Sequence, residues 1–436
     1  MEVDRHFWKR EIVWTWTVVG MLVGIVIGRL WQGMCLQPAR IRRTLERQGI
    51  TGPPPSFLRG NAPEMRRITQ LYLHLSPTSS STLSVVVGPS HDWPLGPLLG
   101  NGIIRANGPH WALQRKLLSP ELYPDKVKGM VGLMMESATT MMETWVERLV
   151  ESNEEVAEFV VDKELRSFSA DFISKACFGS SYSQGKEIFA RLEQLQDAIG
   201  KPGLIFRLPT LGFLPTKHNK RIRRLQMEIE ILILKVINDR QELDEVDAGS
   251  KKDLLKGCWK RLVLWQECVH AEILEVSGCD QNCFQDLDTL NKLKTLMMVI
   301  QETLRLYTPP IVLAREALEN IKLGDLLVPK GTHIWALFRV LHRDPKNWGP
   351  DANEFRPERF ANGASEACKY PQAYMPFGCG ARLCLGHSFA MAELKFILAL
   401  ILSKFSFSLS PAYHHSPVYR MLLSPQHGVK LLMKRF

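Results

Sequence analysis

The sequence predicts a mainly α-helical fold with small β-sheets, an α+β architecture, because helical and strand patterns occupy different parts of the chain. Over residues 126–247, apolar side chains recur mostly at positions i, i+3 and i+4, which is typical of amphipathic helices. Residues 311–328 alternate as strands do, and Val328-Pro329-Lys330-Gly331 is an expected turn. Residues 385–403 are predicted to be an apolar helix, and the tail after them to form β-hairpins.

The composition fits one large domain. The chain has 436 residues, 45% hydrophobic and 23% charged, so it can bury a sizeable core. Neither a linker nor a repeat interrupts residues 61–436, which are predicted to form that domain. The net charge of +10 suits anionic lipid or an acidic partner protein, and the lack of basic runs with interleaved aromatics argues against nucleic acid. Nine cysteines without a pairing rhythm indicate a reduced, cytosol-facing domain.

An uncharged apolar segment, residues 12–28, predicts a membrane anchor over residues 1–31. The segment has the shortest length that spans a bilayer. Tryptophans bracket it, as they do at membrane interfaces: Trp8, Trp14, Trp16 and Trp31. Residues 32–60 are predicted to be a basic, proline-rich linker that includes a stiff spacer, Gly52-Pro53-Pro54-Pro55.

Flanking charges predict the orientation of this anchor. Basic residues are denser after the segment (Arg29, Arg40, Arg42, Arg43 and Arg47) than before it (Arg5, Lys9 and Arg10). The domain that follows should therefore lie in the cytosol. A cleaved secretory signal is the competing interpretation, but no A-x-A-like cleavage site follows, so an uncleaved anchor is favoured.

Other elements are predicted from local patterns. Residues 61–75 are expected to form a helix and residues 76–90 a polar, Ser/Thr-rich loop. A helix opens at Pro109, and residues 217–245 form a long amphipathic helix. Residues 290–307 form another helix, which ends at Thr308-Pro309-Pro310 because proline cannot continue it.

The most informative motif is the glycine-rich run Pro376-Phe377-Gly378-Cys379-Gly380-Ala381-Arg382-Leu383-Cys384-Leu385-Gly386. Its glycines permit positive φ and a narrow turn, while Arg382 and the following helix N-terminus would stabilise a thiolate at Cys384. One alternative is a simple turn with a buried, inert cysteine. Another is a zinc site, which lacks two close cysteine pairs. Its four ligands would be Cys368, Cys379, Cys384 and His387.

The pattern Phe377-Gly378-x-Gly380-x-Arg382-x-Cys384-x-Gly386 resembles the haem-binding loop of the cytochrome P450 monooxygenases. The resemblance implies a haem (iron protoporphyrin) with Cys384 as the proximal iron ligand and Arg382 as a partner of a haem propionate. In this family the thiolate pushes electron density onto iron and favours O–O cleavage. Electrons would come from NADPH through a flavoprotein, NADPH-cytochrome P450 reductase.

Two further regions resemble the family's propionate contacts. Trp111 and Arg115 share a helix face at i, i+4, and this spacing resembles the helix whose tryptophan and arginine reach a propionate. A surface arginine packed over a tryptophan would have the same spacing. Arg315 falls where the family often places another propionate partner, although it could equally be an arginine at a sheet edge.

Glu302 and Arg305, at i, i+3 on the helix of residues 290–307, form a common type of surface pair. Arg359 follows at the distance where the family supplies a second arginine. The resemblance implies a buried Glu302–Arg305–Arg359 cluster that holds the cysteine loop in place. Its bidentate arginine–carboxylate geometry would satisfy the charges.

One family feature is missing from the sequence. The long distal helix, whose carboxylate and alcohol deliver protons to dioxygen, has no recognisable segment, so the catalytic residues are unknown. Gly278-Cys279-Asp280-Gln281 lies in a polar loop and is rejected as a substitute. The fold is therefore predicted to be incomplete, with apparent gaps near residues 92–95 and 256–264. Skipped exons or a faulty gene model would explain both.

Two functions from different classes remain open. The first is a monooxygenase that inserts one atom of O2 into an apolar, terpenoid or steroid-like substrate. It would be a single-pass protein of the endoplasmic reticulum membrane, with its domain in the cytosol. The amino-acid sequence of several segments resembles that of plant microsomal members of the clan that oxidises gibberellins, other terpenoids and steroid hormones. The second is an inactive or truncated membrane-bound isoform that lacks the distal proton relay.

Overall fold

The structure is a computed structural model that describes the greater part of the chain after residue 95. Described residues are 36–50, 83–86, 96–100, 102–151, 155–178, 182–199, 216–239, 259–278, 284, 286–310, 312–420 and 422–436, with scattered positions in 14–32. The helix expected at residues 61–75 and the spacer at Gly52-Pro53-Pro54-Pro55 lie outside them.

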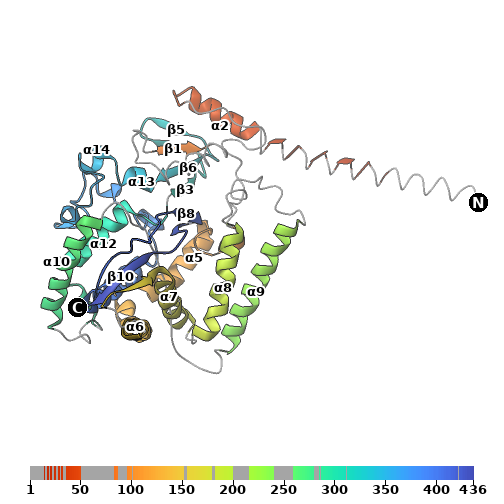
Figure 1. Cartoon of the computed structure of the whole chain (residues 1–436). Helices are drawn as coiled ribbons and strands as arrows, with labels where there is room; N and C mark the ends of the chain where they lie inside the picture. The colour runs from red at the N-terminus through yellow and green to blue at the C-terminus, as the bar shows by residue number, and fades with distance from the viewer. Residues whose placement is uncertain are drawn as a thin grey trace, which may run out of the picture.

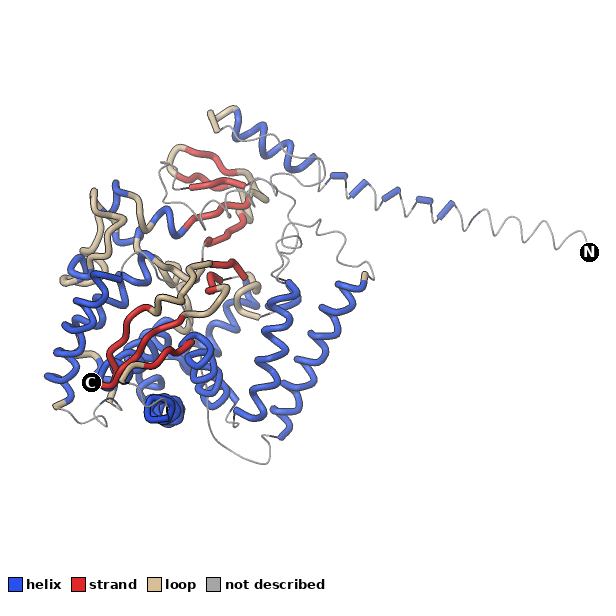
Figure 2. The backbone as a smooth tube through the Cα atoms, in the orientation of Figure 1, coloured by secondary structure: helices blue, strands red, loops and turns tan. Residues whose placement is uncertain are grey.

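Helices form most of the described chain (Figures 1 and 2). The longer ones are α2 (Gln37–Glu46), α5 (Gly108–Leu118), α6 (Pro124–Glu151), α7 (Val161–Phe178), α8 (Tyr182–Ile199), α9 (Lys217–Asp239), α10 (Trp259–Ser277), α12 (Lys294–Leu306) and α15 (His387–Lys404). Short ones are α4 (Gly96–Leu99), η2 (Ser119–Leu122), α11 (Leu287–Leu290), α13 (Phe338–Leu341), α14 (Pro345–Trp348), η5 (Pro357–Phe360), η6 (Pro371–Ala373) and η7 (Gly380–Arg382).

The strands form small antiparallel sheets, as the sequence predicts. They are β1 (Leu83–Val86), β2 (Ala157–Val160), β3 (Val312–Glu316), β4 (Ile321–Leu323), β5 (Leu326–Val328), β6 (His333–Leu337), β7 (Phe405–Leu409), β8 (Pro417–Arg420), β9 (Leu422–Pro425) and β10 (Lys430–Arg435). One sheet has the order β1-β6-β3 and another β2-β10-β7, while β4-β5 and β8-β9 are two-stranded. In β3–β6, Arg315 lies opposite Ile334.

The main core lies between α6, α7, α10, α12 and α15 and the sheet of β7 and β10. α15 is almost uniformly apolar, and many of its side chains are buried, so it is a central helix of this core. Met134, Met141 and Met142 of α6 also lie in it, as their helical spacing indicates. α8 and α9 pack side by side around a smaller cluster (Figure 1).

The structure refines several expected elements. β1 lies in the predicted polar loop, because its apolar run pairs with β6. β2 interrupts the predicted helical region, and α12 begins later than expected because Asp286 caps the separate helix α11. α2 lies within the predicted linker. Its Ile41 and Leu45, one turn apart, are buried, and Gln48 after it exchanges hydrogen bonds with Leu327 of β5.

Two predictions concern residues at the limits of the described chain. Most of the predicted anchor, residues 1–31, is not described, and none of the described helices combines the length and apolar character needed to cross a membrane. The junction near 92–95 is likewise not described. Of the junction near 256–264, residues 259–264 belong to α10 and the preceding residues 240–258 are not described.

Candidate functional site

The cysteine motif folds into a narrow loop immediately before α15. Gly378 and Gly380 have φ of 78° and 64°, a left-handed conformation that side chains other than glycine rarely adopt. The Cys384 N–H donates to the Phe377 carbonyl at 2.9 Å and closes the loop. The Phe377 ring packs on the core and edge-on to the His387 ring, with centroids 4.7 Å apart. The loop is therefore held at both ends.

Cys384 itself is a free, exposed thiol three residues before the first residue of α15. The positive end of a helix dipole favours an anion at this position, so the placement suits a thiolate ligand. The alternative of a buried, inert cysteine is wrong. The four residues of the zinc alternative do not form a site, because no group of three or more His, Cys, Asp or Glu among the described side chains is placed to hold a metal ion.

Arg382 joins the cysteine loop to the start of α5. Its guanidinium donates to the Ala106 carbonyl and to Asn107 Oδ1, both at 2.9 Å. It also lies over the Trp111 ring, 4.3 Å from the ring centroid. Trp111 and Arg382, each predicted to lie near a haem propionate, are therefore in direct contact, although 271 positions separate them in the sequence.

Arg115 completes the connection from the next turn of α5. Its Nη1 donates to the Leu383 carbonyl at 2.6 Å, beside Cys384. The spacing of Trp111 and Arg115 therefore places both side chains on the helix face that meets the loop. Trp111 is covered by Arg382 and not by Arg115, which corrects the alternative of a surface arginine packed over the tryptophan.

Arg315 of β3 brings a third guanidinium to this place. Its Nη1 donates to the Ala314 carbonyl at 2.9 Å. The pKa of Arg382 is lowered by burial and by the positive charges of Arg315 and Arg115, and burial lowers the pKa of Arg315. Burial therefore removes part of the hydration of each guanidinium, although for Arg315 the nearby Cys379 partly opposes the lowering of the pKa.

Arg115, Arg315 and Arg382 fit a cofactor with two negative charges, and Cys384 fits the metal that such a cofactor carries. For the described residues, the polar contacts of Arg115, Arg315 and Arg382 are to carbonyl and amide oxygens, with no carboxylate among them. Charges gathered without counter-ions are stabilised when carboxylates bind between them. The two propionates of a haem are such carboxylates, and the exposed Cys384 thiol supplies the ligand for iron. The donor set therefore matches the expected cofactor.

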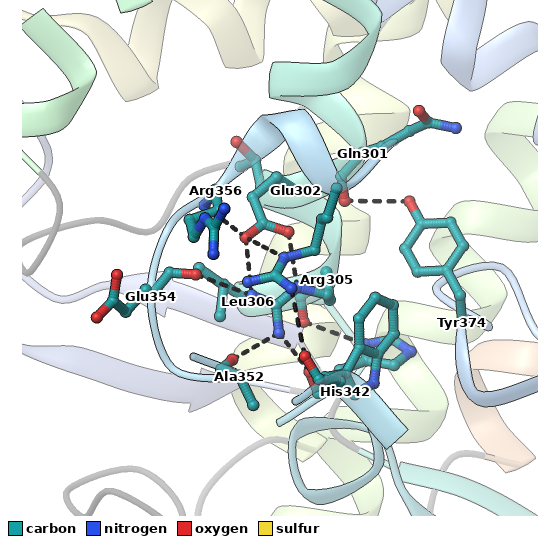
Figure 3. Close-up of polar contacts among 12 residues, drawn as sticks. Gln301, Glu302, Arg305, Leu306, His342, Ala352, Glu354, Arg356 and Tyr374 are labelled. Carbon is teal, nitrogen blue, oxygen red and sulfur yellow. Dashed lines mark hydrogen bonds and ion pairs between the residues drawn. The ribbon is translucent and has the colours of Figure 1, made fainter. Parts of the chain in front are cut away.

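The predicted cluster of Glu302, Arg305 and Arg359 is present, with Glu302 and Arg305 buried at its centre (Figure 3) and Arg359 partly buried beside them. Glu302 and Arg305 are both 0% exposed. Arg305 Nε lies 2.6 Å from Glu302 Oε2 and its Nη2 lies 2.8 Å from Oε1, a bidentate pair. Arg359 Nε contacts Oε1 at 3.2 Å, and the Arg356 N–H donates to the same oxygen at 2.7 Å.

The remaining guanidinium hydrogens attach the segment of residues 342–359 to α12. Arg305 donates to the carbonyls of His342 at 2.6 Å, Ala352 at 2.7 Å and Glu354 at 3.0 Å. Its guanidinium also lies over the Trp348 ring, 4.9 Å from the centroid. The cluster is therefore the centre of a network, and it ties an irregular segment to a helix of the core.

The sequence does not predict the polar residues that surround this cluster. His342 and Thr308 are buried and lie in contact. The Tyr374 hydroxyl donates to the Gln301 carbonyl at 3.1 Å (Figure 3). Burial raises the pKa of Tyr374 and lowers the pKa of His342. A histidine followed by charged residues has no local signal of burial. The expected distal acid–alcohol pair is not assigned to any described residue.

Known proteins resemble this chain over nearly all of its length. The cytochrome P450 family profile matches residues 94–260 and 265–433. Cytochrome P450 714A2 of Arabidopsis thaliana is 39% identical over 518 aligned positions, covering 96% of this chain and 97% of that protein. Cytochrome P450 714C2 of Oryza sativa subsp. japonica is 40% identical over 493 positions, covering 92% and 94%. Both alignments are longer than this 436-residue chain, so each relative has segments without a counterpart here.

A solved structure shows the same fold. The crystal structure of the cytochrome P450DA heme domain matches with a TM-score of 0.63 at 20% identity, covering 79% of this chain and 82% of that chain. Members of the matched family bind haem through a cysteine thiolate. With the fold, the glycine-rich cysteine loop and full-length relatives in agreement, this chain belongs to the cytochrome P450 family of oxidoreductases, the haem-thiolate monooxygenases.

Proposed function

We propose that this chain binds haem through Cys384 and inserts one atom of O2 into an apolar, terpenoid or steroid-like substrate. Arg115, Arg315, Arg382 and Trp111 would hold the haem propionates, and Phe377 and Gly386 would shape the loop that presents Cys384 to iron. Bound haem supplies the oxidative chemistry, with the second oxygen atom leaving as water. Support comes from one observation above all. Three guanidiniums meet at the cysteine loop: the charges of Arg115 of α5 and Arg315 of β3 both act on Arg382, and Arg115 donates to the carbonyl of Leu383, next to Cys384.

The protein's own contribution is positioning. The loop backbone and the N-terminus of α15 stabilise the sulfur as an anion. Arg115 and Arg382 connect α5 to the loop, so a ring bound between them has a defined orientation relative to Cys384. Val312 and Leu313 precede Arg315 on β3, and we place them at the substrate side. The proposed substrate class rests on the resemblance of several segments to plant microsomal members, and the relatives matched over the whole chain are plant proteins as well.

Electrons enter from NADPH through the flavoprotein NADPH-cytochrome P450 reductase in this proposal. The net charge of +10 suits an acidic partner surface. Residues 1–31 anchor the chain in the endoplasmic reticulum membrane with the domain in the cytosol. Fractionation of cells that express the tagged chain tests the anchor: the protein should stay with microsomes after a carbonate wash, and its release would contradict the anchor.

A second candidate function is an inactive or truncated membrane-bound isoform. Two observations favour it: the relatives' extra segments, and the division of the family match between residues 260 and 265. These support a missing stretch near residues 256–264, around the start of α10, where the distal helix with its proton relay is expected. Sequencing the transcript between the codons for Asp253 and Trp265 tests whether the stretch is absent from the messenger RNA.

The carbon-monoxide difference spectrum of the reduced protein tests haem-thiolate ligation. We expect the thiolate-type Soret band in the wild type and its complete loss in Cys384→Ser. Cys379→Ser is the matched control, because Cys379 is an exposed thiol of the same loop and should be dispensable. A folded wild type without the band, or a band that survives in Cys384→Ser, would refute the ligand assignment. Substrate oxidation with reductase and NADPH then separates the active enzyme from the inactive isoform.

A further inference from the structure

We propose that His342 is a positioning residue. It connects the end of α12 to the cysteine loop and keeps Cys384 at the position from which its thiolate would bind haem iron. This inference rests on the proposed function of the same site. It assigns a role to a side chain outside the loop and outside the Glu302–Arg305–Arg359 cluster. The role predicts a change in how haem is ligated, which can be measured separately from any change in protein stability.

The ring of His342 is enclosed and neutral. It is 0% exposed and is surrounded by the rings of Phe338, Trp348 and Tyr374, with centroids 5.8, 6.4 and 5.8 Å away. Burial, with the positive charges of Arg305 and Arg343 nearby, lowers the pKa of His342 to about 3. A neutral imidazole has one donor nitrogen and one acceptor nitrogen, so its contacts must be of both kinds.

The contacts determine which nitrogen carries the hydrogen. The Met375 backbone N–H donates to His342 Nε2 at 3.1 Å, so Nε2 must hold a lone pair. The hydrogen is therefore on Nδ1, which faces Thr308 Oγ1 at 2.8 Å and the Arg305 carbonyl at 3.1 Å. The Thr308 hydroxyl has its own acceptor, the Leu304 carbonyl at 2.6 Å, so its oxygen is free to accept from Nδ1. The hydrogen bonds therefore run in one order: the Met375 N–H donates to the His342 ring, the ring donates to Thr308, and the Thr308 hydroxyl donates to the Leu304 carbonyl.

This chain of contacts leads from α12 into the cysteine loop. Met375 accepts the Gly378 N–H at 2.9 Å through its carbonyl, at the first left-handed residue of the turn. Phe377 in turn accepts the Cys384 N–H at 2.9 Å. The side chain of His342 therefore fixes the residue from which the loop starts, and short backbone bonds carry that position to Cys384.

His342 is also held from its main chain, so the ring cannot move independently of the ion pair. Its carbonyl accepts from Arg305 Nη1 at 2.6 Å (Figure 3), while the ring contacts the Arg305 carbonyl and Thr308. A shift of the Glu302–Arg305 pair would therefore move both the main-chain carbonyl and the ring of His342. The geometry differs from that of a histidine that only fills the core, because the ring provides the acceptor for a loop N–H.

Two substitutions separate the two halves of the ring. Gln at position 342 can place an amide oxygen near the Nε2 position and accept from Met375. Asn is shorter and can place its amide nitrogen near the Nδ1 position, where it donates to Thr308 and leaves the Met375 N–H without an acceptor. Both variants have one side-chain amide, so they are matched in chemistry and differ in which contact survives.

The test compares full-length, haem-loaded wild type, His342→Gln and His342→Asn. The fraction of bound haem that gives the thiolate-type carbon-monoxide band is measured, with total haem and melting temperature determined separately. We expect His342→Gln to keep nearly the wild-type fraction and His342→Asn to lose it by about fivefold or more, because the loop N–H then lacks a buried acceptor.

Every outcome of this test either supports the positioning role of His342 or overturns it. Equal thiolate fractions in the two variants overturn the positioning role, whether both are high or both are low. A wild type without the band overturns the proposed function, and this inference with it. If His342→Asn does not fold, amide hydrogen exchange at Met375 decides instead: slow exchange in wild type and in His342→Gln supports the inference, and fast exchange in either overturns it.

Discussion

Arg305 illustrates how much of this site depends on single buried side chains. It is 0% exposed, it pairs with Glu302, and it donates to three backbone carbonyls, so its full set of hydrogens is used. A buried arginine is tolerated only where such contacts replace its hydration. The same contacts make the residue irreplaceable, because lysine lacks the planar fork that reaches them together.

Replacement of Arg305 by methionine should therefore lower the free energy of unfolding by about 3–5 kcal/mol, because Glu302 is left as an uncompensated buried charge. Chemical denaturation monitored by tryptophan fluorescence measures this change. Arg224→Met is the matched control, since Arg224 pairs with Glu228 on α9 while its side chain is 79% exposed. The control should cost under about 0.5 kcal/mol. Similar losses in both variants would contradict the burial argument.

At the scale of elements, α15 both follows the cysteine loop and crosses the core. Most of its buried side chains are apolar, but Glu393 is buried as well and accepts from the Ser169 hydroxyl of α7 at 2.6 Å. Burial raises the pKa of Glu393 to about 7, against a lowering contribution from Ser169. The carboxyl is therefore held in its neutral form more strongly in the folded chain than in the unfolded chain.

The sign of the pH effect follows from this shift. The pKa of Glu393 is about 4.5 in the unfolded chain and about 7 in the folded chain, so between these pH values the folded state binds more protons. The contribution of Glu393 to stability is therefore fully present below pH 4.5 and is lost as the pH rises through 7. Glu393→Gln keeps the acceptor for Ser169 but cannot ionise. We expect its free energy of unfolding, relative to wild type, to rise by about 3 kcal/mol between pH 4.5 and 8. A difference that does not change with pH would contradict the assignment.

At the scale of the whole molecule, the haem site is assembled from parts that are distant in the sequence. α5, β3 and the cysteine loop meet through side chains of Arg115, Arg315 and Arg382, and α5 has no buried residue of its own. Its position relative to the loop therefore depends on polar contacts such as the bond from Arg115 to Leu383. A dianionic ring bound between these parts would convert mutual repulsion of the arginines into attraction.

Haem binding should consequently raise the melting temperature, since a ligand that binds only the folded state stabilises it by mass action. Arg382→Gln should weaken haem affinity by about tenfold to a hundredfold, the worth of a charge-assisted hydrogen bond. Without haem the same variant should lose less stability, because the repulsion from Arg115 and Arg315 is relieved. Differential scanning fluorimetry with and without hemin measures both effects. An equal loss in the two states would contradict a propionate contact.

Much of the fold could be predicted because its signals are local. The 3.6-residue period of α9 and α12, the prolines after Tyr307 and the glycines of the cysteine loop each specify backbone conformation within a few residues. Elements that depend on partners were missed. β1 is a strand because it lies along β6, and α2 packs beside β5 although its sequence resembles a basic linker.

The amino-acid sequence alone predicted the family and the candidate ligand Cys384 from one tight motif, and the resemblance that this motif carries implied the cluster of Glu302, Arg305 and Arg359. Only the tertiary structure decided which face of α5 meets the loop, that Arg382 rather than Arg115 covers Trp111, and that His342 is enclosed with its hydrogen on Nδ1. The physical reason is that burial, mutual repulsion of charges and hydrogen-bond direction depend on groups hundreds of residues apart, and the chain brings them together only when it folds.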